Sequence, residues 1–151
     1  MAFDDVGPLR DILQRALARY LTVRPGGFQL VDDGRLHDEI VARILGFGGA
    51  RTLYRNRKPA CRSLDGIRPL HDQKLTCADC RSRANCTPQV RVDLIVDGRP
   101  LRLLLAYTSA KNFLAYDALL RRQSVALERV LHRLRVVDRG PWGEVRFSKR
   151  D

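Results

Sequence analysis

Val90-Arg-Val-Asp-Leu-Ile-Val96 is followed by Asp97-Gly98 and then by a second apolar run, from Leu101 to Tyr107. The first run alternates between apolar and polar residues, which is typical of a strand with one buried face. Asp-Gly favours a two-residue hairpin turn, because both residues tolerate the positive φ that such a turn requires. We therefore predict an antiparallel hairpin over residues 90–107.

Further strands and one helix are expected on both sides of this hairpin. Before it, residues 37–47 are rich in β-branched side chains, and the glycines that follow indicate a bend or bulge ahead of another short strand. After it, Thr108-Ser109 would cap a helix. Residues 127–137 fit a helix or a strand, and Val136-Val137 favours a strand in the second half. The predicted strands are 28–31, 37–47, 52–54, 90–96, 101–107, the second half of 127–137 and 144–147, and the predicted helix is 110–122.

The order of these elements predicts a β-rich α+β fold. A hairpin and a third strand, then a helix, then two more strands is the order of the OB-fold, a five-stranded Greek-key barrel. A mixed α+β sheet built from the same elements is the main alternative. We expect an N-terminal helix and linker over residues 1–27, because apolar residues recur at helical spacing from Leu9 to Tyr20, and an OB-like domain over residues 28–151.

All four cysteines lie in one window, within a loop that we place at residues 58–88. Cys77-Ala-Asp-Cys80 is a C-x-x-C pair, and Cys61 and Cys86 flank it. Zn²⁺ takes four thiolate or imidazole ligands, and a site with all four positions on the protein is structural rather than catalytic. The window has few large apolar residues, so a metal would have to stabilise it. We predict a structural zinc site, with His71 as the alternative to one cysteine, and disulfides as the alternative in an oxidising compartment.

The chain is strongly basic, with 28 Lys and Arg against 17 Asp and Glu and a net charge of +11. Nearly all of these cations are arginines, whose guanidinium groups bind phosphate oxygens and stack on bases. We therefore expect a nucleic-acid partner. The N-terminal residues do not resemble a signal peptide, and no apolar run is long enough to span a membrane. A cytoplasmic protein without a membrane partner is expected.

Basic and aromatic residues indicate where nucleic acid would bind. Proteins that bind single strands combine a cationic groove with aromatic side chains on which bases stack. Trp142, in a Pro-Gly turn, would either stack on bases or fill one end of the barrel, and Tyr54 is open to the same two interpretations. The predicted contact residues are Arg51, Tyr54, Arg55, Arg57, Lys58, Arg62, Tyr107, Arg139, Trp142 and Arg146.

Catalytic motifs do not accompany these residues. The sequence has no G-x-S-x-G, no phosphate loop and no G-x-G-x-x-G. No H-x-E precedes the C-x-x-C, although a zinc deaminase needs that glutamate. We expect a non-enzymatic protein.

Several short segments resemble small proteins encoded by phages and mobile elements. They are Cys61-Arg-Ser-Leu-Asp-Gly66, the C-x-x-C, Cys86-Thr-Pro88 and Thr108-Ser-Ala-Lys-Asn112. In architecture, residues 28–148 resemble the zinc-containing OB-fold single-stranded-DNA-binding proteins of tailed phages. Those proteins can use a histidine as one zinc ligand and often have an acidic tail, whereas this sequence offers four cysteines and ends in Lys149-Arg150-Asp151. The resemblance implies DNA handling during replication or recombination.

These observations predict a zinc-stabilised nucleic-acid-binding protein, with single-stranded DNA as the favoured ligand. The main alternative is a zinc-loop module that docks on a larger assembly, such as a polymerase or an RNA-guided nuclease. A further alternative is an accessory factor of a nuclease. Salt dependence separates the first two, because phosphate binding weakens steeply with salt.

Overall fold

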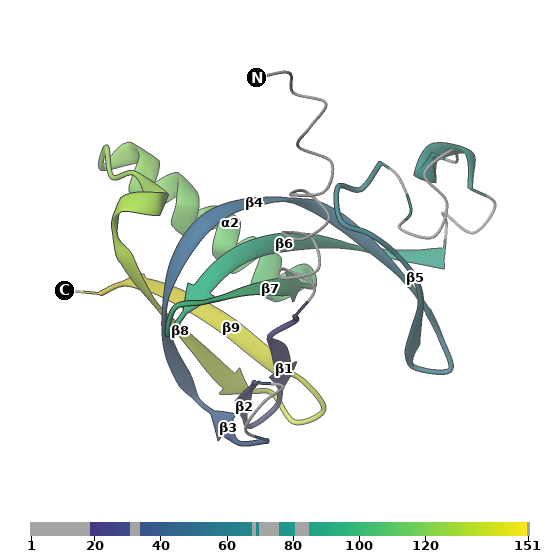
Figure 1. Ribbon diagram of the computed structural model, residues 1–151, viewed down its shortest axis with the longest axis horizontal. Helices are drawn as coiled ribbons and strands as arrows, with labels where there is room; N and C mark the ends of the chain where they lie inside the picture. Colours follow the sequence, from purple (N-terminus) through teal and green to yellow (C-terminus); the bar gives the residue numbers. More distant parts are fainter. Residues whose placement is uncertain (1–18, 31–33, 68, 70–75, 81–84, 151) are drawn as a thin grey trace.

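Two antiparallel sheets and one long helix make up the described part of the protein (Figure 1). The structure is a computed structural model, and it describes residues 19–30, 34–67, 69, 76–80 and 85–150. The larger sheet has the strand order β7-β6-β4-β8-β9, with β5 also paired to β4, and the smaller sheet has the order β1-β2-β3. The predicted β-rich α+β class is confirmed.

The elements have the following bounds. The strands are β1 (Thr22–Arg24), β2 (Gly27–Gln29), β3 (Leu36–His37), β4 (Glu39–Arg55), β5 (Lys58–Ser63), β6 (Cys86–Val96), β7 (Arg99–Leu105), β8 (Leu131–Asp138) and β9 (Gly143–Lys149). The long helix is α2 (Tyr107–Arg122), and the short 3-10 helices are η2 (Cys77–Asp79) and η4 (Leu127–Arg129).

The predicted hairpin is present as β6 and β7. Its register runs from Val90 opposite Leu105 to Val96 opposite Arg99, and the turn residues Asp97 and Gly98 have φ values of 50° and 76°. The return strand ends at Leu105, so Tyr107 begins the helix instead of ending the strand. The apolar side chains of the predicted alternation, Val92 and Leu94, are fully buried in the core.

One continuous strand, β4, replaces the two strands predicted between residues 37 and 54. The glycines do not end it; the ladder with β6 shifts register between Ile44 and Gly46, which is the predicted bulge. Figure 1 shows β4 arching across the molecule. Its first residues pair with β8, its middle and end pair with β6, and its last residues also pair with β5. The curved strand therefore connects every part of the larger sheet.

In the small sheet, β1 lies where a linker was predicted, whereas β2 overlaps the predicted strand 28–31. Most of the predicted N-terminal helix falls outside the described residues, but Tyr20 forms an isolated bridge with Arg102, and Pro25 and Gly26 make the turn between β1 and β2. Gly27 has a φ of 148°, and a Cβ there would lie 2.6 Å from the carbonyl oxygen of His37, so only glycine fits. The next residue, Phe28, is fully buried and joins the small sheet to the core.

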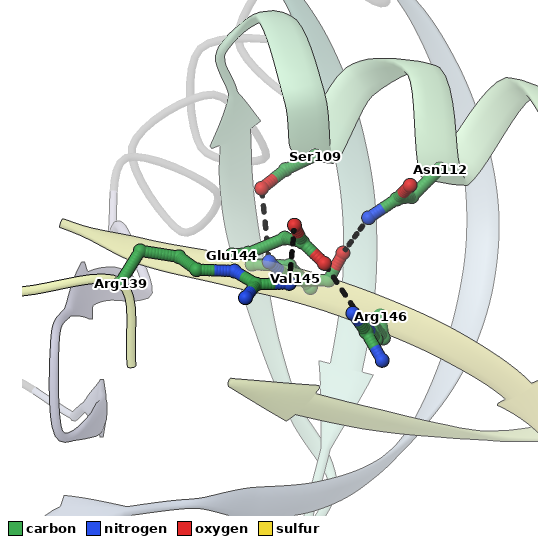
Figure 2. Close-up of polar contacts among 6 residues, drawn as sticks. All are labelled: Ser109, Asn112, Arg139, Glu144, Val145 and Arg146. Carbon is green, nitrogen blue, oxygen red and sulfur yellow. Dashed lines mark hydrogen bonds and ion pairs between the residues drawn. The ribbon is translucent and has the colours of Figure 1, made fainter. Parts of the chain in front are cut away.

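The larger sheet stays open, which corrects the prediction of a five-stranded barrel. Among the described residues β7 and β9 do not pair with each other, and β5 makes a sixth strand. Two side chains of α2 occupy the free edge of β9 instead (Figure 2). The backbone N–H of Val145 donates to Ser109 Oγ at 2.9 Å, and Asn112 Nδ2 donates to the carbonyl oxygen of Val145 at 3.0 Å. The helix thus takes the hydrogen bonds that a closing strand would make.

This contact also explains where the helix begins. Thr108-Ser109 was predicted to cap it, but the N-cap residue is Ala106, and no side-chain hydrogen bond caps the helix there. Ser109 is in the first turn, with its hydroxyl already used by β9. No helix in the described part of the chain is long and apolar enough to cross a membrane.

A polar pair is enclosed between α2 and β8. His132 is fully buried; its Nε2–H donates to the carbonyl oxygen of Leu127 at 2.7 Å, so its Nδ1 accepts the hydroxyl proton of Tyr116 at 2.5 Å. Burial lowers the pKa of His132, although the hydrogen bond to Leu127 acts in the opposite direction. Burial also raises the pKa of Tyr116 to about 12. Both side chains are therefore neutral at pH 7.

Candidate nucleic-acid interface

The β4–β5 hairpin carries a cluster of exposed cations. Residues 54–60, Tyr-Arg-Asn-Arg-Lys-Pro-Ala, are all exposed, and the segment holds Arg55, Arg57 and Lys58 without an acidic residue. Figure 1 shows this hairpin extending from the body of the protein. We call residues 54–60 the basic tip. Its three cations face solvent rather than the core, so they are available to a phosphate backbone.

The backbone of the basic tip is unusual for its residues. Asn56 and Arg57 have φ values of 53° and 64°. A two-residue hairpin turn with both central residues in the left-handed region is most favourable as Asn-Gly. Asparagine tolerates this conformation, but arginine, with a Cβ, is destabilised by about 1–2 kcal/mol there. An arginine thus occupies the position where glycine would be the more stable choice.

Tyr54 stands at the base of the basic tip and is held by a chain of hydrogen bonds. Thr52 Oγ1 donates to Gln89 Oε1 at 2.6 Å, and Gln89 Nε2 donates to the Tyr54 hydroxyl at 3.2 Å. Thr52 and Gln89 are buried, whereas Tyr54 is 42% exposed. Tyr54 is therefore not a core residue, and its hydroxyl is held against the sheet by Gln89.

Arg51 and Arg62, which were predicted with the tip residues, lie in a more enclosed place. Both are half-buried. The guanidinium carbon of Arg62 lies 4.4 Å from the centre of the Tyr20 ring. The Nε of Arg51 is buried and has no hydrogen-bond partner among the described residues. The structure brings these two arginines to the root of the hairpin and not to its exposed tip.

The remaining predicted residues gather at the turn between β8 and β9 and at the start of α2. Arg139 and Arg146 both bind the nearly buried carboxylate of Glu144, with nitrogen–oxygen distances of 3.3 and 2.7 Å (Figure 2). The hydrogen bond from Arg146 holds the pKa of Glu144 below its ordinary value, against the effect of burial, and the charges of both arginines act in the same direction. The carboxylate fixes both guanidinium groups and neutralises one of their two charges.

Trp142 and Tyr107 are exposed at the same end of the protein. Trp142 is 43% exposed and Tyr107 is 75% exposed. Lys111 Nζ lies 5.0 Å from the centre of the Tyr107 ring. Trp142 is thus not a core plug. The sequence did not indicate that Glu144 holds two arginines or that Ser109 and Asn112 bind β9, because these contacts join segments that are far apart in the chain.

Two of the four cysteines lie on the strands that flank the last part of β4. Leu53 in β4 pairs with Cys61 in β5 on one side and with Cys86 in β6 on the other. Strands lie about 4.7–4.9 Å apart, so the Cα atoms of Cys61 and Cys86 are roughly 10 Å apart in one row. Cys77 and Cys80 belong to the tight turn at η2, where the N–H of Cys80 donates to the carbonyl oxygen of Cys77 at 3.3 Å.

The thiols are near one another without forming a compact ligand set. None of the four forms a disulfide, and all are half-buried. Burial raises the pKa of Cys61, and the charges of Cys86, Cys80 and Cys77 raise it further, so the three other sulfurs lie within electrostatic reach of the first. Among the described residues no group of three or more His, Cys, Asp or Glu side chains is arranged to hold a metal ion. His71, the alternative ligand, lies outside the described residues.

The basic tip thus lies directly beside Cys61 on one hairpin, and the exposed aromatic residues form a second group beside β9 and α2. No protein family model, no curated protein and no solved structure matches this chain.

Proposed function

We propose that this chain is a non-enzymatic, zinc-stabilised nucleic-acid-binding protein that prefers single-stranded DNA. The observation that carries the proposal is the basic tip: seven consecutive exposed residues with three cations, no carboxylate and an oriented tyrosine. Cations that neutralise phosphates release counterions, and this release drives binding to any strand. Tyr54 adds a ring face for a base at the root of the cations.

The position of Arg57 supports a role in binding rather than in folding. Arg57 makes its turn less stable than glycine would, and its side chain is exposed. Strained residues tend to persist where they act on a ligand. We therefore assign phosphate contact to Arg55, Arg57 and Lys58 first, and a supporting role to Arg51 and Arg62.

Zinc would bind Cys61, Cys77, Cys80 and Cys86. Four thiols and no other donor form the ligand set of a structural site, which has no open position for water. Bound there, the metal supplies folding energy by joining the C-x-x-C turn to β5 and β6. The cysteines would hold the root of the hairpin in place and so present its basic tip.

The strand order supports an OB-like assignment as part of the same proposal. The strands form the meander β4-β6-β7, followed by α2 and by the hairpin β8–β9, with β4 at the centre of the sheet. This order is compatible with an open OB-like sheet. In such a fold the loop between the first two strands borders the ligand. Here that loop contains the basic tip and the cysteines.

The test is a binding series with labelled single-stranded DNA, duplex DNA and RNA at two salt concentrations, measured by fluorescence anisotropy. We expect the tightest binding to single-stranded DNA, and a fall in affinity of at least tenfold from low to high salt. A variant with Arg55, Arg57 and Lys58 all changed to Ser should lose this binding, while the exposed control Arg122→Ser on α2 keeps it. Absence of binding to all three ligands at low salt would leave the docking module as the better explanation.

A further inference from the structure

A cavity lies between three segments that are far apart in the sequence. It measures about 440 Å³, within the range of small-molecule sites. Its walls come from β1 and the turn after it, from the end of β7 with the first turn of α2, and from the β8–β9 turn. The residues used below are Val23, Arg24, Ala106, Tyr107, Trp142 and Gly143.

The cavity is formed by elements of the fold that pack closely on one another. Gly143 packs so closely on both β1 and β8 that a Cβ would lie 2.7 Å from Val136 Cγ1 in β8, and closer still to the carbonyl oxygen of Arg24 in β1. This close approach sets the separation between the β1–β2 turn and the β8–β9 turn. The hydrogen bonds from Val145 to Ser109 and from Asn112 to Val145 hold the third wall, α2, against β9. These contacts therefore fix the positions of all three walls relative to one another.

The chemistry of the walls points to an aromatic ligand that carries negative charge. Two exposed aromatic side chains, Trp142 and Tyr107, border the cavity, and among the described residues no other ring or cation packs on Trp142. Val23 and Ala106 add apolar surface. Of the described residues that line the cavity, Arg24 alone is charged, and none is acidic. Arg24 is exposed and is directed by its Nε hydrogen bond to Gln29 at 3.2 Å.

We propose that this cavity, which we call the β1–α2–β9 pocket, binds one unpaired nucleobase of a bound strand. The base would stack on Trp142, with Tyr107 at the rim, and the phosphate of the same nucleotide would contact Arg24. This inference rests on the proposed nucleic-acid binding, and it adds a recognition element for a base that the basic tip lacks. A paired base cannot enter, because both of its faces and its hydrogen-bonding edge are already occupied in the duplex. The pocket therefore accounts for a preference for single strands.

Trp142 is the only tryptophan of the chain, so its fluorescence reports on the pocket directly. The probes are a labelled oligothymidylate and an oligonucleotide of the same length with abasic sites in place of the bases, which has the same phosphates. Label anisotropy measures binding, and Trp142 emission measures stacking. We expect the thymidylate to quench Trp142 and to bind roughly 5- to 150-fold more tightly than the abasic strand, as one stacked base provides.

Two variants and a control complete the design. Trp142→Ala should reduce the preference for the base-containing strand to near unity while leaving binding of the abasic strand unchanged. Ala106→Phe places a ring in the pocket at an exposed position and retains Trp142, so it should abolish both the quenching and the preference. Leu114→Ala, at an exposed position on α2 that does not line the pocket, should change neither.

Different results would refute the base-binding pocket and the proposed nucleic-acid binding. Equal affinity for both strands, with Trp142 emission unchanged in the folded protein, would overturn the pocket while leaving binding at the basic tip intact. Quenching by the abasic strand to the same extent would overturn it too, because no base would be stacking. If neither strand binds at low salt, the proposed function fails and the pocket assignment fails with it.

Discussion

Replacing Arg57 with glycine should separate folding from binding in a single change. Arg57 has a φ of 64°, where a residue with a Cβ is destabilised by about 1–2 kcal/mol relative to glycine. Glycine also has more conformational freedom in the unfolded chain, which offsets about 0.4–1 kcal/mol of the stability gained by relieving this destabilisation. The Arg57→Gly protein should therefore be more stable by roughly 0.5–1 kcal/mol, a rise in Tm of about 1–4 °C for a chain of this size.

Binding should move in the opposite direction. The variant lacks one phosphate contact, so its affinity should fall for every sequence, and the slope of log K against log salt should become shallower by about 0.7 on a single strand. Thermal unfolding and anisotropy titrations at several salt concentrations measure the two effects on the same preparation.

The control for this variant lies in the same turn. Asn56→Gly changes the neighbouring residue, which also has a positive φ of 53° but carries no charge. It should alter stability slightly, because asparagine already tolerates this conformation, and leave the salt slope unchanged. An Arg57→Gly protein that melts lower than the parent, or that keeps the parental affinity and salt slope, would refute the reasoning.

Three further predictions concern the metal, the buried histidine and the contact between α2 and β9. Purified protein should contain one zinc per chain, and Cys80→Ser should lower both the zinc content and the stability, because the binding energy is folding energy; elemental analysis that finds no metal in the parent would contradict this. Burial lowers the pKa of His132, so the unfolded chain, with a histidine pKa of about 6.5, takes up the proton first as the pH falls. The stability that His132 contributes is then fully present above about pH 6.5 and is lost as the pH falls through the pKa of His132 in the folded protein, with a slope of at most about 1.4 kcal/mol per pH unit. In urea unfolding, the difference in stability between the parent and His132→Gln should therefore shrink over that pH range. A difference that stays constant with pH would disprove this prediction. Ser109→Ala removes the acceptor of the buried Val145 N–H and should destabilise the protein by about 1–3 kcal/mol, whereas the exposed Ser148→Ala should have little effect in the same unfolding experiment.

Local signals in the sequence were sufficient for the elements that neighbouring residues determine. The alternation in residues 90–96 and the Asp97-Gly98 turn predicted β6 and β7, because a hairpin depends on residues that are close along the chain. The strand in residues 131–138 was predicted from its β-branched end in the same way. Where a local signal had two uses, the prediction failed: Ser109 has the composition of a cap, but its hydroxyl serves the neighbouring strand β9.

Contacts between distant segments left no comparable signal. The glycines of residues 46–49 could end a strand or bend it, and the partners that decide the matter, β6 and β8, lie far along the chain. The same holds for the candidate site. Composition indicated Trp142 and Tyr107 one by one, but only the fold places them on one cavity with Arg24. The exposed Arg55, Arg57 and Lys58 were predictable, because a charged hairpin turn needs no distant partner.

The long strand β4 also determines the order in which this protein can fold. Its residues beyond Arg43 pair with β5 and β6, which follow within about 55 residues, but Glu39 to Arg43 pair with Arg135 to Leu131, more than 85 residues later. On a growing chain the far end of β4 can form its ladder early, while the first residues keep an unpaired edge until β8 has been synthesised. Closing so long a loop is slow, and an edge left open in the meantime favours aggregation. We therefore expect slow refolding and a tendency to aggregate at high concentration, because one strand is shared among three partners.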